Sequence, residues 1–235
     1  MRALKSLLFL LPVLAACPST GATDGGTDAA VVPDGPLACQ PDAGPDGGNI
    51  PDMALTQPPH QNACNPQQIA DYAKCQGAKQ TDLCAEFKPG GTGEACGKCI
   101  ETPFEIDGGT AVWGVIVFNG STAFMNVEGC VNDALGSYDC GNSLYHLYRC
   151  EELVCSACTG SDFATCELES TSDPTYCKPY ADIVNDSSGP CSAINDPDAA
   201  ISGDVTNCFP DTSITDSTSQ QVDWLTRIVT YMCGP

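Results

Sequence analysis

The stretch AVWGVIVFNGSTAFMNV, residues 111–127, decides the central fold prediction. Two runs rich in β-branched and aromatic residues flank Asn119-Gly120, the preferred two-residue hairpin turn because both positions tolerate positive φ. The first run, 111–118, is apolar on both faces, which predicts a strand buried on both sides. A third strand over 103–106 is expected to join through the turn Asp107-Gly108-Gly109. A hairpin alone is marginal in water, so helices are expected to cover it.

A helix is predicted ahead of this hairpin. Asn65 is a suitable N-cap, Pro66 suits the first helical position, and Gln68 completes a capping-box pattern. Apolar residues then recur on one face until Gly77 ends the run.

More helices are predicted after it. Helical spacing of apolar residues indicates helices over 144–154 and over 222–232, the second ended by Gly234-Pro235. Asp173-Pro174 is expected to start another helix, which Pro179 should interrupt. The remaining residues between 178 and 216 are expected to form loops.

The first sixteen residues have the pattern of an export signal. Arg2 and Lys5 give a positive start, and Leu7–Ala16 is apolar apart from Pro12. Such a run is too short to span a bilayer core, which needs roughly 20 residues in a helix. Residues 1–16 are therefore predicted to be a cleaved signal peptide.

The signal ends in Leu14-Ala15-Ala16-Cys17, which resembles the lipobox of bacterial lipoproteins. The resemblance implies that signal peptidase II cuts before Cys17 and that this cysteine carries the lipid anchor to a membrane. Pro18 stands where an aspartate, in this family, favours the inner membrane, so an envelope location at the outer membrane is expected. The alternative is an ordinary secretory signal with a chance cysteine.

Residues 17–62 are predicted to be a lipidated, disordered tether, followed by one Cys-rich domain over 63–235. The tether is rich in proline and glycine, and it holds six aspartates, no basic residue and few large apolar groups. Beyond Ala16 the formal net charge falls from −21 to −23, because Arg2 and Lys5 are lost. That charge repels phosphate backbones, so no nucleic-acid partner is expected.

Seventeen cysteines are the strongest compositional signal. Setting Cys17 aside leaves an even number in an exported chain, which indicates a disulfide framework. Metal binding is the rival interpretation, weakened by only two histidines, and neither a metal site nor a cofactor is predicted. The domain alone holds an odd number of cysteines, so Cys39 of the tether is expected to pair with one of them. Linkage to a second molecule and free thiols are the alternatives.

Two CxxC motifs raise the question of redox chemistry. Cys96-Gly97-Lys98-Cys99 resembles the active pair of thioredoxin-like enzymes, but the tryptophan usual before that pair and a βαβ pattern are missing. Cys155-Ser156-Ala157-Cys158 is expected at a helix end, where the dipole disfavours a thiolate. A structural role is therefore preferred for both motifs, and also over a four-thiolate zinc site that would combine them.

Hydrolase machinery is sparse. The domain contains one histidine, His146, and no Gly-x-Ser-x-Gly elbow. Tyr145 and Tyr148, which lie on the same predicted helix as His146, are expected in the core. A carboxylate pair for glycoside hydrolysis stays open, but acidic residues are so numerous that no pair is singled out.

The fold class expected is α+β, a small disulfide-rich, mostly helical domain around a short antiparallel hairpin or meander. Residues 126–177 loosely resemble uncharacterised Cys-rich lipoproteins of Gram-negative bacteria, a resemblance that implies no activity. The function expected is a non-enzymatic binding or envelope-structural module, with a protein or glycan as its partner. The alternatives are a thiol–disulfide oxidoreductase using Cys96 and Cys99, and a carboxylate-based hydrolase.

Overall fold

The computed structural model describes residues 55–56, 58–104, 112–119, 122–159, 161–195 and 204–235. These residues fall into two compact units. The larger unit comprises the described residues up to Arg149 and those from Pro179 to Pro235, and the smaller unit comprises Cys150–Lys178. None of the helices in this part of the chain has the length and apolarity needed to cross a membrane. The predicted signal peptide, Cys17 and Cys39 lie outside the described residues.

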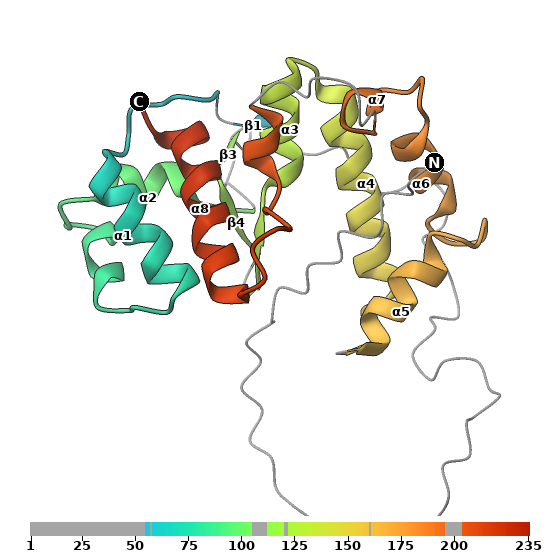
Figure 1. Ribbon diagram of the computed structural model, residues 1–235, viewed down its shortest axis with the longest axis horizontal. Helices are drawn as coiled ribbons and strands as arrows, with labels where there is room; N and C mark the ends of the chain where they lie inside the picture. Colours follow the sequence, from blue (N-terminus) through green and yellow to red (C-terminus); the bar gives the residue numbers. More distant parts are fainter. Residues whose placement is uncertain (1–54, 57, 105–111, 120–121, 160, 196–203) are drawn as a thin grey trace, which may run out of the picture. The chain divides into compact units, whose positions relative to one another are not determined.

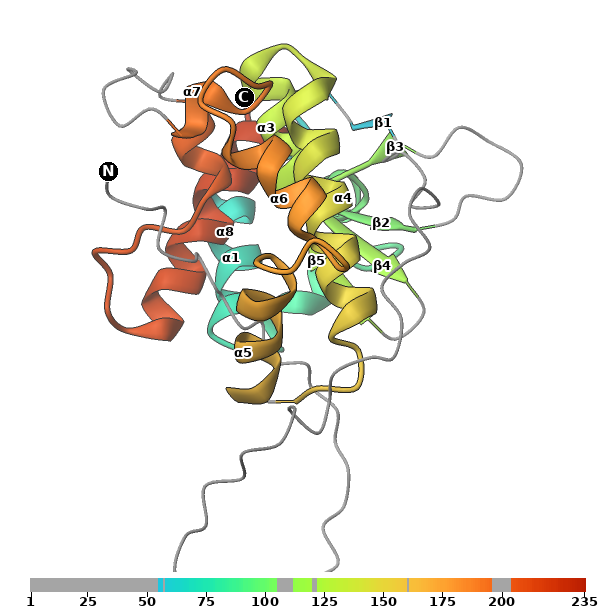
Figure 2. The ribbon, with the colours of Figure 1, turned by 90° about the vertical axis from the view of Figure 1, so that its right-hand side faces the viewer.

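Mostly helical structure surrounds two small sheets in the larger unit, which confirms the predicted α+β class (Figure 1). In the three-stranded sheet, β4 (Ile116–Asn119) lies between β2 (Glu101–Pro103) and β5 (Thr122–Met125). β1 (Leu55–Thr56) and β3 (Val112–Trp113) form a separate parallel pair. Figure 2 shows β2 and β4 side by side. β2 runs parallel to β4, not antiparallel as in a meander, and between them in the chain lies β3, which pairs with β1.

The predicted hairpin is present as β4 and β5, but its register differs from the one that an Asn119-Gly120 turn would impose. That turn would place Phe118 opposite Ser121, whereas Phe118 pairs with Ala123 and Asn119 pairs with Thr122.

An apolar cluster lies beneath the hairpin. The observed pairing sets the buried Val117 opposite Phe124, whose ring lies 5.7 Å from that of Trp113. The two registers differ by two residues, so Phe124 stays on the same face and its partner changes from Val115 to Val117.

The single strand predicted over 111–118 is broken at Gly114. A Cβ there would lie 2.1 Å from the backbone oxygen of Cys99, so only glycine allows this approach. Thr102 and Asn126 satisfy the freed backbone: the Gly114 amide donates to Thr102 Oγ1 at 3.0 Å, and Asn126 Nδ2 donates to the Gly114 carbonyl at 2.9 Å. The break sends one half of the run to each sheet.

Asn126 also begins the next helix. α3 (Val127–Leu135) is capped by Asn126, whose Oδ1 accepts from the Gly129 amide at 3.0 Å. The Asn126 residue is 1% exposed, so its amide group joins the strand break to the helix start inside the core.

Sequence reasoning located the first helix closely. α1 (Pro66–Gly77) has Pro66 at its first position and a complete capping box between Asn65 and Gln68, as predicted. It is followed by the 3-10 helix η1 (Leu83–Phe87) and by α2 (Glu94–Ile100).

The last helix organises the core of the larger unit. α8 (Ser217–Cys233) follows the N-cap Asp216, so it begins earlier than the predicted start at residue 222, and it ends at Gly234 as predicted. It lies along α1 (Figure 1). The two helices approach so closely at Gly77 that a Cβ there would come within 2.8 Å of Val222 Cγ2. The helix face predicted to be apolar is buried, and it comprises Trp224, Leu225, Ile228, Val229, Tyr231 and Met232.

The chain just before α1 is ordered against the end of α8. The amides of His60, Gln61 and Asn62 donate to carbonyls of Tyr231, Met232 and Gly234, respectively. Composition assigns these residues to the tether, yet the folded part begins no later than Leu55.

α4 (Tyr138–Val154) begins in the larger unit, and its last residues belong to the smaller one. The smaller unit also contains α5 (Ser161–Ser170), which sequence reasoning missed. The helix predicted to start at Asp173-Pro174 and break at Pro179 is wrong. Turns cover 171–177, and α6 (Lys178–Asn185) begins next to Pro179, which suits a first helical turn because its missing N–H has no partner there. The segment predicted as loops also contains α7 (Ser192–Asn195) and the 3-10 helix η2 (Val205–Cys208).

Disulfides join distant elements in both units. In the larger unit the bonds are Cys64–Cys96, Cys75–Cys84, Cys99–Cys233, Cys130–Cys208 and Cys140–Cys191. In the smaller unit they are Cys150–Cys177 and Cys155–Cys166. The predicted disulfide framework is therefore present.

We expect Asn126→Ala to lower the free energy of unfolding by about 2–4 kcal/mol, because it removes a helix cap and leaves the buried Gly114 carbonyl unpaired. The matched control is Asn65→Ala, which removes an exposed cap and should cost about 1 kcal/mol. Urea unfolding of both variants provides the comparison, and equal losses would contradict the linking role of Asn126.

We also expect the cost of removing a disulfide to follow the length of chain that it closes. Cys99–Cys233 spans 134 residues and Cys75–Cys84 spans 9. Loop-closure entropy predicts about 5 kcal/mol for the first and about 2.5 kcal/mol for the second. Paired cysteine-to-alanine variants of each bond, unfolded in guanidinium, measure the difference. A larger loss from the short loop would show that strain or local packing, and not chain entropy, sets the stability.

Candidate functional site

The first CxxC motif does not form a redox pair in this structure. Cys96 lies in α2 and is bonded to Cys64, whereas Cys99, one turn later, is bonded to Cys233. The two cysteines are 0% and 6% exposed. A thioredoxin-like reaction needs the two sulfurs of the motif to bond to each other, and here each is committed to a separate structural bridge.

The second motif is also built into the framework. Cys155 is bonded to Cys166, and Cys158 is disulfide-bonded as well. A four-thiolate zinc site needs deprotonated thiols, which these bonds consume. In the part of the chain that the structure describes, no group of three or more histidine, cysteine, aspartate or glutamate side chains is placed to hold a metal ion.

His146 lies in α4 among aromatic rings. Its ring centroid is 6.2 Å from that of Tyr145 and 5.9 Å from that of Tyr180. Tyr145 is buried against Trp113, which confirms its predicted core position. Tyr148 is 38% exposed, so the same prediction for that residue is wrong.

The clearest unusual chemistry is a set of buried and half-buried carboxyl groups. Glu128, the second residue of α3, is 4% exposed, and its Oε2 has no hydrogen-bond partner within the described residues. Burial raises the pKa of Glu128 to about 7, although the nearby Arg149 opposes the rise. Burial likewise raises the pKa of Asp133, later in the same helix, to about 7.

The smaller unit holds a second pair of carboxyl groups. Glu151 follows Cys150 in α4, and Glu167 follows Cys166 in α5. Burial, with a smaller contribution from the charge of Glu167, raises the pKa of Glu151 to about 8. Burial raises the pKa of Glu167 to about 7. Sequence reasoning named neither residue, and their place directly after cysteines of neighbouring helices is the only signal that marks them.

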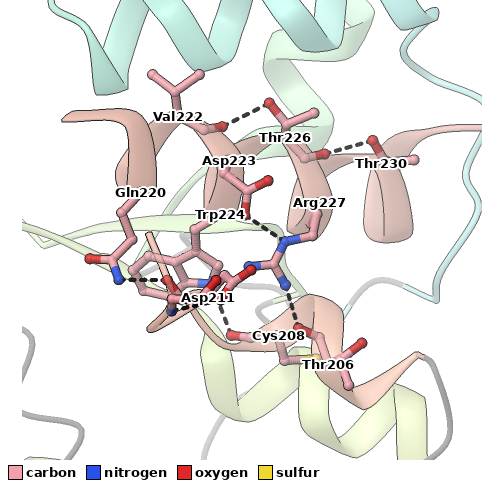
Figure 3. Close-up of polar contacts among 11 residues, drawn as sticks. Thr206, Cys208, Asp211, Gln220, Val222, Asp223, Trp224, Thr226, Arg227 and Thr230 are labelled. Carbon is pink, nitrogen blue, oxygen red and sulfur yellow. Dashed lines mark hydrogen bonds and ion pairs between the residues drawn. The ribbon is translucent and has the colours of Figure 1, made fainter. Parts of the chain in front are cut away.

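Arg227 on α8 is half-buried in a polar network (Figure 3). Its Nε donates to Asp223 Oδ2 at 2.8 Å, and its Nη1 donates to the Thr206 carbonyl. The guanidinium thereby attaches η2 to α8.

Two further bonds in Figure 3 complete this attachment. Trp224 Nε1 donates to the Cys208 carbonyl at 3.0 Å, and Gln220 Nε2 donates to the Asp211 carbonyl at 2.8 Å. Every acceptor in these two bonds is a backbone carbonyl, and Cys208 is also covalently bonded to Cys130 of α3. The network therefore serves to hold the segment before α8 in place.

The buried carboxyl groups predict an inverted pH dependence of stability. A carboxyl whose pKa is raised on folding contributes stability below its unfolded pKa and loses it as pH rises through its folded pKa. The free energy of unfolding should therefore be highest near pH 4 and fall between about pH 4.5 and pH 8.

Glu128→Gln tests the largest single contribution, because this side chain is fully buried and glutamine mimics the protonated acid. The substitution should raise the free energy of unfolding at pH 8 by on the order of 3 kcal/mol and leave it nearly unchanged at pH 4. Glu152→Gln removes a charge from an exposed position of α4 and is the control. The same effect at both pH values would show that Glu128 is not the titrating group.

No protein-family model, curated protein or solved structure matches this chain.

Proposed function

We propose that the chain is an exported, lipid-anchored envelope protein whose folded part is a non-enzymatic binding or structural module. The observation that carries the proposal is that all fifteen cysteines among the described residues are disulfide-bonded. Such a framework forms and persists in oxidising compartments outside the cytoplasm. The predicted signal peptide, residues 1–16, would deliver the chain to such a compartment.

The anchor is assigned to Cys17 on its lipobox resemblance, with the outer membrane favoured over the inner membrane by Pro18. A lipid on Cys17 explains how a chain without a membrane-crossing helix in its described part would stay with the envelope. Stable anchoring needs more than one acyl chain, and the diacylglycerol that the lipobox resemblance implies carries two.

The choice of a non-enzymatic module follows from where the candidate catalytic groups lie. Both sulfurs of the Cys96 motif belong to separate bridges, and His146 is surrounded by tyrosine rings. Arg227 donates to the Asp223 carboxylate and to the Thr206 carbonyl. The cysteines and Arg227 thus hold the fold, which leaves a rigid acidic body suited to contact a protein or glycan partner.

A carboxylate-based hydrolase is the second candidate, and Glu151 with Glu167 is the pair that favours it. A raised pKa keeps one carboxyl protonated near neutral pH, which a general acid requires. Residues 150–177 contain no basic residue, so desolvation and mutual repulsion dominate there. Comparing wild type with Glu151→Gln on polysaccharides of the bacterial envelope tests this function. Release of reducing ends by wild type alone would favour it over the module.

Cys17→Ala tests the anchor. The variant should lose labelling by a clickable fatty acid and move from the membrane fraction to the soluble fraction, because the acylated thiol is gone. Cys39→Ala is the matched control and should remain labelled and membrane-bound, since it removes a nearby cysteine outside the lipobox. Continued labelling of Cys17→Ala would refute the lipid anchor.

A further inference from the structure

Cys158 has a disulfide partner outside the described residues. It is 7% exposed and disulfide-bonded. The other fourteen described cysteines are already joined to one another in seven bonds. The chain has seventeen cysteines, so the only candidates left within it are Cys17 and Cys39.

We propose that Cys39 is bonded to Cys158, so that the tether is fastened covalently to the smaller unit. The choice between the two candidates rests on the proposed function, because an acylated Cys17 has no thiol to offer. Cys39 belongs to the same chain, so its thiol meets Cys158 in an intramolecular reaction that does not depend on the protein concentration.

The surroundings of Cys158 suit a fixed attachment point. Its amide donates to the Cys155 carbonyl at 2.9 Å, and Cys155 is itself bonded to Cys166 of α5. Cys150–Cys177 closes the same unit a second time. A Cys39–Cys158 bond would therefore attach the tether to a segment that two other disulfides already hold in place.

Bond formation balances as an ordinary thiol–disulfide exchange. The Cys39 thiolate attacks the disulfide of an oxidised dithiol protein of the envelope and forms a mixed disulfide. The Cys158 thiolate then attacks the Cys39 sulfur and expels the donor as a dithiol. Two protons and two electrons pass from the two thiols to the donor.

The bond changes the covalent path that connects the anchor to the folded part of the chain. Without it, the covalent path from Cys17 to the described part of the chain passes through residues 18–54. With it, a shorter path runs from Cys17 to Cys39 and across the disulfide to Cys158. The first part of the fold on that path is the smaller unit, Cys150–Lys178.

Peptide mapping of the non-reduced full-length protein tests the bond directly. Cleavage before aspartate and after glutamate should yield residues 34–41, with Cys39, linked to 153–161, with Cys155 and Cys158. Residues 162–167 join the same species through Cys166. Alkylation under denaturing, non-reducing conditions should find no free thiol in wild type. Cys39→Ser should expose one thiol at Cys158, and the double variant Cys39→Ser/Cys158→Ser should expose none.

A protease test measures whether the domain stays attached to the membrane after the tether is cut. A specific cleavage site is inserted between Gly47 and Gly48, and membranes are treated with the protease without reductant. The cut domain should stay with the membranes until a reductant is added, whereas the same insertion in Cys39→Ser/Cys158→Ser should release it at once. Release of both proteins without reductant would overturn the proposal.

The outcomes separate this inference from the proposed anchor. A Cys39–Cys158 peptide in a protein whose Cys17 carries no lipid would refute the anchor and support the inference. A Cys17–Cys158 peptide would overturn both. Free Cys39 in wild type, or a Cys39-linked dimer that reduction dissolves, would overturn the inference and leave the anchor standing.

Discussion

Cys99 and Cys233 are 134 residues apart in the chain, and one covalent bond joins them. The end of α2 and the end of α8 therefore meet at a single point. The backbone oxygen of Cys99 also faces Gly114, where the central strand breaks because no side chain fits. Helix packing and the division of the apolar run into two sheets thus depend on the same few atoms. This junction also shows why the core tolerates little change in side-chain volume there.

Sequence reasoning succeeded where structure is determined locally. The capping box of Asn65 and Gln68 depends on four consecutive residues, and it is present as predicted. The apolar stripe of α8 and the existence of the β4–β5 hairpin likewise follow from short-range patterns. The disulfide framework was predictable from an even count of cysteines, Cys17 set aside, in a chain with a predicted export signal.

The remainder depends on contacts between distant residues, which one sequence does not specify. The hairpin register, in which Phe124 lies near Trp113, and the parallel course of β2 along β4 both involve residues that no local pattern brings together. Disulfide connectivity is equally non-local. The buried state of Glu128 is hidden in a chain with thirty acidic residues, because only the packed helices reveal which carboxyl loses water.

The bond between Cys150 and Cys177 gives the smaller unit an unusual relation to the rest of the chain. Its two ends enter and leave with Cα atoms 5.6 Å apart, and a second bond, Cys155–Cys166, is nested inside. The two disulfides therefore close the residues between Cys150 and Cys177 into a separately cross-linked insertion. Such an insertion can be exchanged, extended or excised in engineered or evolving chains while the entry and exit points keep their spacing.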